Sequence, residues 1–254
     1  EAADQVVSLA LTVEVGCIVP NHAYPGQMPD LAQPMLDLHG GNVCQMETAR
    51  GTDTLRGLGG DDTYVVDSAD DVVIEAAQGG TDQVRSTVSW TLGDNVENLT
   101  LAGTTGLSGT GNALANRITG NAGANALGGG DGADTLVGGA GVDTLTGGDG
   151  ADWFCFASPI DGRDVITGFA SGVDRLVVLT PDFAELPADA QAALVSGVAP
   201  EATGTGPVFL YDTATGQLVF DADGSGDEQG VLLATLVGQV GLTAQDLLLQ
   251  STAS

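Results

Sequence analysis

A nine-residue period of glycine and aspartate constrains this chain more than any other feature of its sequence. Residues 129–155 read GGDGADTLV, GGAGVDTLT and GGDGADWFC, three successive copies of the pattern G-G-x-G-x-D-x-U-x, where U is a large apolar residue. A helix interior does not tolerate that much glycine, and a strand gains nothing from the spacing. The period therefore predicts a repeat architecture in which each copy forms one small structural unit.

The same frame extends upstream with substitutions. Four further nine-residue windows carry an amide or a carboxylate at the sixth position, and these residues are Asn116, Asn125, Asp53 and Asp62. Between the windows lie short segments rich in Val, Thr and Leu, separated by Gly, Asn and Asp. Segments of this kind are typical of strands and turns.

The chemistry of one repeat predicts how the repeats stack. Six residues turn and three extend, so two repeats form a coil of about 18 residues whose U side chains fill a narrow core between parallel sheets. Sixth positions 18 residues apart then lie above one another. The predicted columns are Asn116, Asp134 and Asp152 on one edge, and Asn125, Asp143 and Asp161 on the other. Carboxylates stacked at the strand spacing of about 4.8 Å repel one another unless a cation lies between them.

The charge balance supports a cation-binding chain and excludes some partners. The chain has 34 acidic residues against 6 basic ones, for a net charge of −28, while 43% of its residues are hydrophobic. We therefore expect a folded chain that binds neither nucleic acid nor an anionic membrane through its charge; an acidic surface adapted to high salt is the alternative. The apolar run near the N-terminus contains Glu14 and has no basic flank, so we expect neither a signal peptide nor a membrane span there.

The repeats resemble the RTX (repeats-in-toxin) calcium-binding β-roll. This resemblance implies an all-β fold, a parallel β-roll or β-helix solenoid with a small antiparallel C-terminal cap. It also implies several Ca²⁺ ions between stacked turns, held by sixth-position side chains and carbonyls of the glycine turns. The residues so assigned are Gly129, Gly130, Asp131, Gly132, Asp134, Gly138, Gly139, Ala140, Gly141, Asp143, Gly147, Gly148, Asp149, Gly150, Asp152, Gly120, Ala122, Gly123, Asn125, Asn116, Asp161, Asp53 and Asp62. For Asp53 and Asp62, ordinary turn aspartates are the alternative.

The rest of the chain divides into two further parts. Residues 48–163 are the predicted roll, and residues 164–254 are the predicted cap, beginning with a strand pair at 164–179 that leaves the roll. Residues 208–226 read as a hairpin around the turn TATG. This region resembles the cap of proteins exported by type I secretion, in which an uncleaved signal lies in the last tens of residues, here including LTAQDLLLQSTAS.

Residues 1–47 do not follow the repeat. They form an N-terminal cap or the remnant of a larger domain, and they contain the symmetric set Cys17, His22, His39 and Cys44. A Cys17–Cys44 disulfide, two free thiols and a Cys₂His₂ metal site are the open alternatives.

Catalytic motifs are absent from the sequence. It contains neither HExxH nor GxSxG and has only two histidines, so we expect no enzyme activity. The expected function is a secreted calcium-binding module that folds on Ca²⁺ outside the cell after passing the type I secretion machinery. Two alternatives are a calcium-dependent structural protein that self-associates as a layer or filament on the cell surface, and the C-terminal fragment of an RTX exoenzyme whose catalytic domain lies elsewhere.

Overall fold

The computed structural model describes residues 36–37, 45–47, 53–57, 59–159, 161–179, 183, 194–238 and 240–250. Cys17, His22, His39 and Cys44 lie outside these residues, so the three alternatives for them stay open. No helix in the described ranges is long and apolar enough to cross a membrane.

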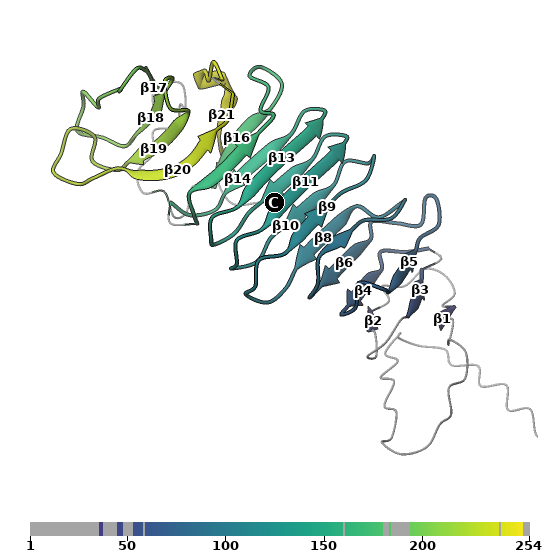
Figure 1. The fold of residues 1–254 in the computed structure, drawn as a ribbon. Helices are drawn as coiled ribbons and strands as arrows, with labels where there is room; N and C mark the ends of the chain where they lie inside the picture. The colour runs from purple at the N-terminus through teal and green to yellow at the C-terminus, as the bar shows by residue number, and fades with distance from the viewer. Residues whose placement is uncertain are drawn as a thin grey trace, which may run out of the picture.

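Two long sheets and one short sheet form the described part of the chain (Figure 1). The first sheet has nine strands, all paired in parallel. In spatial order they are β2 (Gln45–Glu47), β4 (Thr63–Val66), β6 (Gln83–Ser86), β8 (Asn98–Leu101), β10 (Arg117–Thr119), β12 (Thr135–Val137), β14 (Trp153–Phe156), β16 (Arg175–Leu179) and β21 (Leu247–Gln250).

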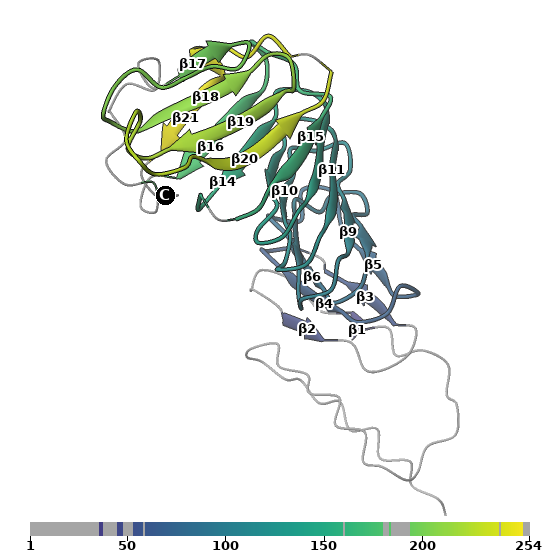
Figure 2. The same ribbon diagram turned by 60° about the vertical axis from the view of Figure 1, so that its left-hand side comes forward.

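The second sheet faces the first along the roll (Figure 2). Its parallel part comprises β7 (Trp90–Thr91), β9 (Ser108–Thr110), β11 (Ala126–Asp131), β13 (Thr144–Asp149), β15 (Asp164–Thr167) and β20 (Val231–Leu236). It continues through β19 (Gln217–Asp221), β18 (Val208–Asp212) and β17 (Leu194–Gly197). A short third sheet contains β1 (Leu36–Asp37), β3 (Thr54–Arg56) and β5 (Val72–Ile74). The predicted parallel β-roll is therefore confirmed.

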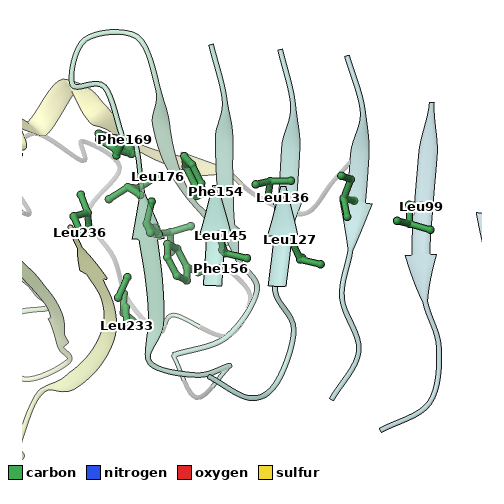
Figure 3. Packing of buried hydrophobic residues seen from close by; sticks show 14 of the residues in the cluster. Leu99, Leu127, Leu136, Leu145, Phe154, Phe156, Phe169, Leu176, Leu233 and Leu236 are labelled. Atoms are coloured by element: carbon green, nitrogen blue, oxygen red, sulfur yellow. The ribbon is translucent and has the colours of Figure 1, made fainter. Parts of the chain in front are cut away.

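The U positions form the core of the roll. Leu127 pairs with Leu145 in the second sheet, and Leu136 pairs with Phe154 in the first, so each side chain stacks on its equivalent one coil away (Figure 3). All four are at most 3% exposed. Burying a leucine or phenylalanine stabilises a fold by about 1.5–3 kcal/mol, and here each coil buries its share only against the neighbouring coils.

The parallel ladders continue past residue 163, where we expected the cap to begin. Strand β15 pairs with β13, and β16 pairs with β14, so residues 164–179 add a further coil and do not leave the roll. The reason is that Ile166 and Leu176 keep the buried U position, and Gly162 and Gly172 keep the fourth-position glycine, although the glycine pair that opens each repeat is lost. The C-terminal strand β21 then pairs in parallel with β16.

The antiparallel hairpin of the cap is confirmed. Strands β18 and β19 pair in antiparallel register, with Tyr211 opposite Leu218, around the turn at residues 213–216. Phe183, Phe209 and Phe220 pack beneath them, with ring centroids 5.1–6.4 Å apart. Since β20 joins the hairpin to β15, the cap extends the second sheet.

Candidate metal centres in the stacked turns

An acidic residue or an asparagine immediately precedes the strands of the first sheet from β4 onward. We call this set the first column; its members are Asp62, Asp82, Glu97, Asn116, Asp134, Asp152, Asp174 and Asp246. A second column lies at the corresponding place in the other two sheets and comprises Asp53, Asp71, Asn125, Asp143 and Asp164. Most of these side chains are buried, which is unusual for carboxylates without a counter-charge.

One oxygen of each repeat aspartate is held by the preceding coil. The backbone N–H of Asn116 donates to Oδ1 of Asp134 at 2.7 Å, and the N–H of Asp134 donates to Oδ1 of Asp152 at 2.9 Å. In the second column the N–H of Asn125 donates to Oδ1 of Asp143 at 2.7 Å. These bonds orient the carboxylates along the column and link successive coils.

The other oxygen has no protein partner. Oδ2 is buried without a hydrogen bond in Asp134, Asp143 and Asp152, the sixth positions of the three complete repeats. Each Oδ2 lies against the first glycine of its own repeat; at Gly129 and Gly147 it takes the space that a Cβ atom would need. A buried carboxylate oxygen without a donor is costly, and its recurrence in three successive repeats fits a cation at each turn.

Backbone carbonyl groups converge on the same places. The carbonyl oxygen of Gly147 lies 2.5 Å from the Cβ position of Gly129, beside Oδ2 of Asp134. Gly148 and Gly150 have φ values of 114° and 143°, and they lie directly over the carbonyl oxygens of Gly130 and Gly132. Only glycine allows this conformation and this approach. Carboxylate and carbonyl oxygens together make a hard ligand set that suits Ca²⁺.

The electrostatics of these turns disfavour the ionised carboxylates. Burial, the opposing hydrogen bond from the N–H of Asn116, and the charges of Asp152 and Asp131 together raise the pKa of Asp134 to about 6, with burial the largest cause. Burial also raises the pKa of Asp143 and Asp152 above the ordinary value. A carboxyl whose pKa is raised in the fold stabilises it at acid pH and loses that contribution as the pH rises. Near neutrality the fold therefore bears the cost of these charges, which a bound cation would offset.

In two turns of the roll, an asparagine side chain provides both a hydrogen-bond donor and a hydrogen-bond acceptor to the backbone. Asn116 Nδ2 donates to the carbonyl of Val96 at 3.0 Å, and its Oδ1 accepts the N–H of Asn112 at 2.7 Å. Asn125 Oδ1 likewise accepts the N–H of Asn121 at 2.8 Å, while Asn125 Nδ2 donates to Leu107 O at 3.3 Å.

These amide contacts bear on the predicted ligand set. An amide supplies its own donor to the carbonyl groups of the preceding coil, so the turn needs no positive charge from outside. We expected Asn116 and Asn125 as metal ligands, together with Gly120, Ala122 and Gly123 of the same turn. In the structure both asparagine oxygens accept a backbone N–H, and the assignment of these residues as metal ligands stays a prediction.

The second column continues through Asp164 and not through Asp161. We predicted Asp161 from an 18-residue step, but Thr144 pairs with Val165, so Asp164 follows Asp143 after 21 residues. The N–H of Asp143 donates to Oδ1 of Asp164 at 3.0 Å, whereas Asp161 Oδ2 accepts the N–H groups of Ala157 and Ser158 within its own turn. Three extra residues in the turn at 157–163 shift the register. Burial raises the pKa of Asp164 to about 7.

Other column members were missed because their spacing along the column differs from 18 residues or because their turns lack the complete glycine pattern. These are Asp71, Asp82, Glu97, Asp164, Asp174 and Asp246. Their shared signal in the sequence is an acidic residue directly before a short Val- or Leu-rich strand. The exposed side chains of Asp131 and Asp149, by contrast, lie at the ends of β11 and β13, and Asp149 contributes its carbonyl to Gly132 N–H at 2.8 Å.

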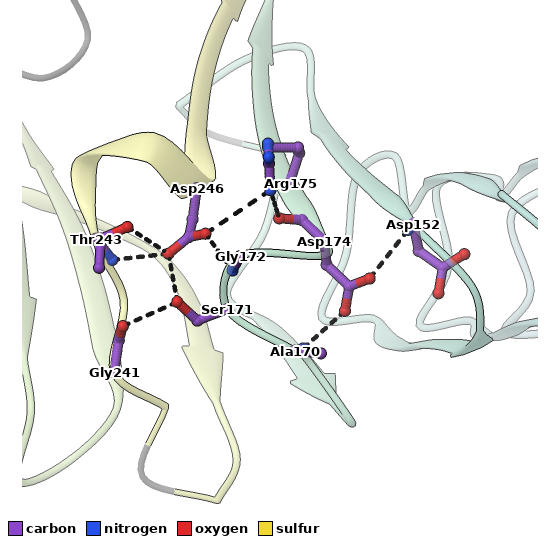
Figure 4. A network of polar contacts seen from close by, with 9 residues as sticks. All are labelled: Asp152, Ala170, Ser171, Gly172, Asp174, Arg175, Gly241, Thr243 and Asp246. Carbon is purple, nitrogen blue, oxygen red and sulfur yellow. Dashed lines mark hydrogen bonds and ion pairs between the residues drawn. The ribbon is translucent and has the colours of Figure 1, made fainter.

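The first column ends in acids that protein groups satisfy (Figure 4). Asp174 accepts the N–H of Asp152 on Oδ1 and the N–H of Ala170 on Oδ2, at 3.0 and 2.7 Å. Asp246 accepts Gly172 N–H at 2.7 Å, the Ser171 hydroxyl at 2.7 Å and both donors of Thr243, and it lies 3.8 Å from the Arg175 guanidinium. This last site therefore differs from the repeat turns, because its negative charge is balanced by donors of the chain itself.

The fold and these turns define a class of protein, a parallel β-roll of stacked glycine–aspartate repeats. The family model "RTX calcium-binding nonapeptide repeat (4 copies)" matches residues 46–73, 110–143 and 128–157. The chain therefore carries RTX calcium-binding repeats, as the sequence predicted.

One solved structure similar to this chain is that of the AlgE6R3 subunit from the Azotobacter vinelandii mannuronan C5-epimerase. It is 25% identical over 63% of this chain and 82% of that one, with a TM-score of 0.34. No curated protein is similar enough to count as a match.

Proposed function

We propose that this chain is a calcium-dependent folding module, exported unfolded by type I secretion machinery and folded by Ca²⁺ outside the cell. The observation that carries the proposal is the buried, unpartnered Oδ2 that recurs in Asp134, Asp143 and Asp152. These three carboxylates would hold the ions, together with carbonyl groups of the glycine turns at 129–132, 138–141 and 147–150. The role is structural binding and not catalysis.

Calcium supplies the positive charge that stacked carboxylates need. The chain has a net charge of −28 and glycine-rich turns. Without calcium, repulsion between its acidic side chains and the conformational entropy of its glycine-rich backbone both oppose folding. Each ion bound at about 100 times its Kd stabilises the folded state by about 2.7 kcal/mol, so a few sites together exceed a typical marginal stability. Mg²⁺ is a poorer fit, because it demands near-ideal octahedral geometry and gives up its water reluctantly.

Export in the unfolded state follows from the same energetics. A cytosol poor in calcium leaves the sites empty and the chain extended, whereas millimolar calcium outside the cell fills them. The similarity of the C-terminal region to type I secreted proteins supports this route. Co-expression with a type I transporter tests it: the chain should appear in the medium, and removal of residues 242–254 should retain it in the cell.

Far-UV circular dichroism tests the folding step. The chain treated with a chelator should show little strand signal, and Ca²⁺ should restore the signal cooperatively while the same concentration of Mg²⁺ should not. A chelated chain with the full strand signal and an unchanged melting temperature would disprove calcium-dependent folding.

A further inference from the structure

The outer face of the first sheet differs in charge from the rest of the chain. Side chains alternate along a strand, so the two residues that flank each buried U position point away from the core. From β4 to β16 none of these outward positions is acidic, although the chain has 34 acidic residues. Three of the six basic residues lie there, and they are Arg85 on β6, Arg117 on β10 and Arg175 on β16. Acidic and basic side chains are therefore segregated on this protein.

Two of these arginines are free to bind an anion. Arg175 lies 3.8 Å from Asp246, and Val177 beside it on β16 is buried although it faces outward. Arg85 and Arg117 are exposed, and their guanidinium groups have neither a hydrogen bond nor an ion pair in the described part of the chain. We call the outward positions of β6 to β14 the basic strip, because β16 is already covered.

An aromatic ring lies at one end of the basic strip. Trp153 of β14 is 39% exposed and stands in register with Thr135 of β12. An exposed indole ring offers an apolar face to the C–H groups of a sugar and an N–H donor to its hydroxyl groups. The strip thus combines an aromatic platform with positive charge.

The three main side chains of the strip lie on alternate strands. Strand β8 separates Arg85 from the strand of Arg117, and β12 separates that strand from the strand of Trp153. Successive members are therefore about 10 Å apart along the roll, twice the distance between neighbouring strands. The strands between them present the hydroxyl groups of Thr100 and Thr135.

This spacing selects among possible polyanions. Each strand of DNA carries one phosphate for about every 3.4 Å, so two arginines about 10 Å apart would leave most phosphates unpaired near a chain of net charge −28. A polysaccharide with a carboxylate on every second sugar has sparser charge and many hydroxyl groups. Arginine binds a carboxylate through two parallel hydrogen bonds, and threonine hydroxyls both donate and accept.

We propose that the basic strip binds an acidic polysaccharide that lies along the roll across β6 to β14. Arg85 and Arg117 pair with carboxylates of the polymer, and Trp153 stacks against one of its sugar rings. The strip lies on the outer face of the strands and not in the glycine turns, so the proposal does not depend on which turns hold calcium.

Titration calorimetry of the full chain in calcium tests the proposal with hyaluronan oligosaccharides, which carry a carboxylate on every second sugar. The unaltered chain should bind them, and Arg117→Gln should weaken the affinity at least about tenfold, because a charge-assisted contact is lost. Arg85→Gln should act in the same way. The matched control Arg163→Gln removes an exposed arginine from the turn before β15 and should change the affinity less than about twofold. No binding by the unaltered chain, or equal losses in Arg117→Gln and Arg163→Gln, would overturn the proposal.

Other polymers tested on the unaltered chain show whether charge and sugar are both recognised. Dextran, a neutral polysaccharide, should give no heat of binding, and single-stranded DNA should bind more weakly than hyaluronan. Dextran binding as tight as that of hyaluronan would show that the arginines are not used. Tighter binding of DNA would show that the strip is a nucleic-acid surface.

Tryptophan fluorescence locates the bound polymer. In Trp90→Phe the only remaining tryptophan is Trp153, and hyaluronan should protect it from quenching by acrylamide. Far-UV circular dichroism checks that this variant keeps the strand signal of the parent chain. Hyaluronan that binds with unchanged quenching of Trp153 lies elsewhere on the chain, which would contradict the assignment of the strip.

Discussion

The backbone N–H of Asp134 donates to Oδ1 of Asp152 at 2.9 Å, and the second oxygen of Asp152 is buried without a partner. The same arrangement links Asn116 to Asp134 and Asn125 to Asp143. One oxygen thus joins neighbouring coils, while the other has no hydrogen-bond partner within the chain.

Removal of two repeat carboxylates should raise the calcium concentration needed for folding. Asp134→Ala/Asp152→Ala deletes two ligands and two links between coils, so we expect a loss of up to about 5 kcal/mol at saturating calcium, about 2.7 kcal/mol for each site. Calcium titrations followed by circular dichroism measure the midpoint. The control, Asp70→Ala/Asp94→Ala, removes the same charge from exposed positions and should leave the midpoint nearly unchanged. Equal shifts in both variants would mean that net charge alone controls folding.

Conversion of the amide turns to carboxylates should make the chain more dependent on calcium. In Asn116→Asp the side chain can no longer donate to Val96 O and Glu97 O, and it adds a charge beside Asp134. We expect the calcium-free form to lose about 1–3 kcal/mol, the cost of leaving buried groups unsatisfied. Calcium should recover part of the loss. Urea unfolding with and without calcium measures the free energy of unfolding in each condition. A variant that is as stable as the parent chain without calcium would contradict the role given to the amides.

The thiol of Cys155 should report the integrity of the roll. Burial raises its pKa to about 11, against the opposing effect of Arg117, and the side chain is 8% exposed. At pH 8 the thiolate is about a hundredfold scarcer than in an ordinary cysteine, and access is blocked as well. In the variant Cys17→Ser/Cys44→Ser, we expect a thiol-reactive reagent to label Cys155 slowly in calcium and fast after chelation. Fast labelling in saturating calcium would show that β14 is not packed as described.

Asp246 should stabilise the C-terminal end of the roll against acid. Burial raises its pKa, but hydrogen bonds from Gly172, Thr243 and Ser171 outweigh burial and lower the pKa below the ordinary aspartate value. A lowered folded-state pKa gives stability that is present above the unfolded pKa of about 3.9 and is lost as the pH falls through the folded value.

Asp246→Asn should therefore cost about 1–3 kcal/mol at pH 7, because charge-assisted hydrogen bonds are replaced by weaker ones, and less below pH 3. Thermal melts in saturating calcium across this range measure the difference. A cost that stays constant with pH would show that packing, and not charge, accounts for it.

The nine-residue pattern predicts some members of the two columns and misses others. Asp134, Asp143 and Asp152 follow from the nine-residue period alone, because each intervening turn has the same length. The steps from Asp62 to Asp82, from Asp143 to Asp164 and from Asp152 to Asp174 span 20, 21 and 22 residues, and no fixed period finds them.

The sequence by itself determined the roll, its U-position core and its complete glycine turns, because steric freedom at glycine and burial of one apolar residue per repeat are local properties. Only the tertiary structure decided which acids share a column, since pairing between coils tolerates longer turns as long as the buried positions align. It also decided that Glu75 meets Asp62 and Asp82, a contact between different sheets that no spacing along the chain encodes.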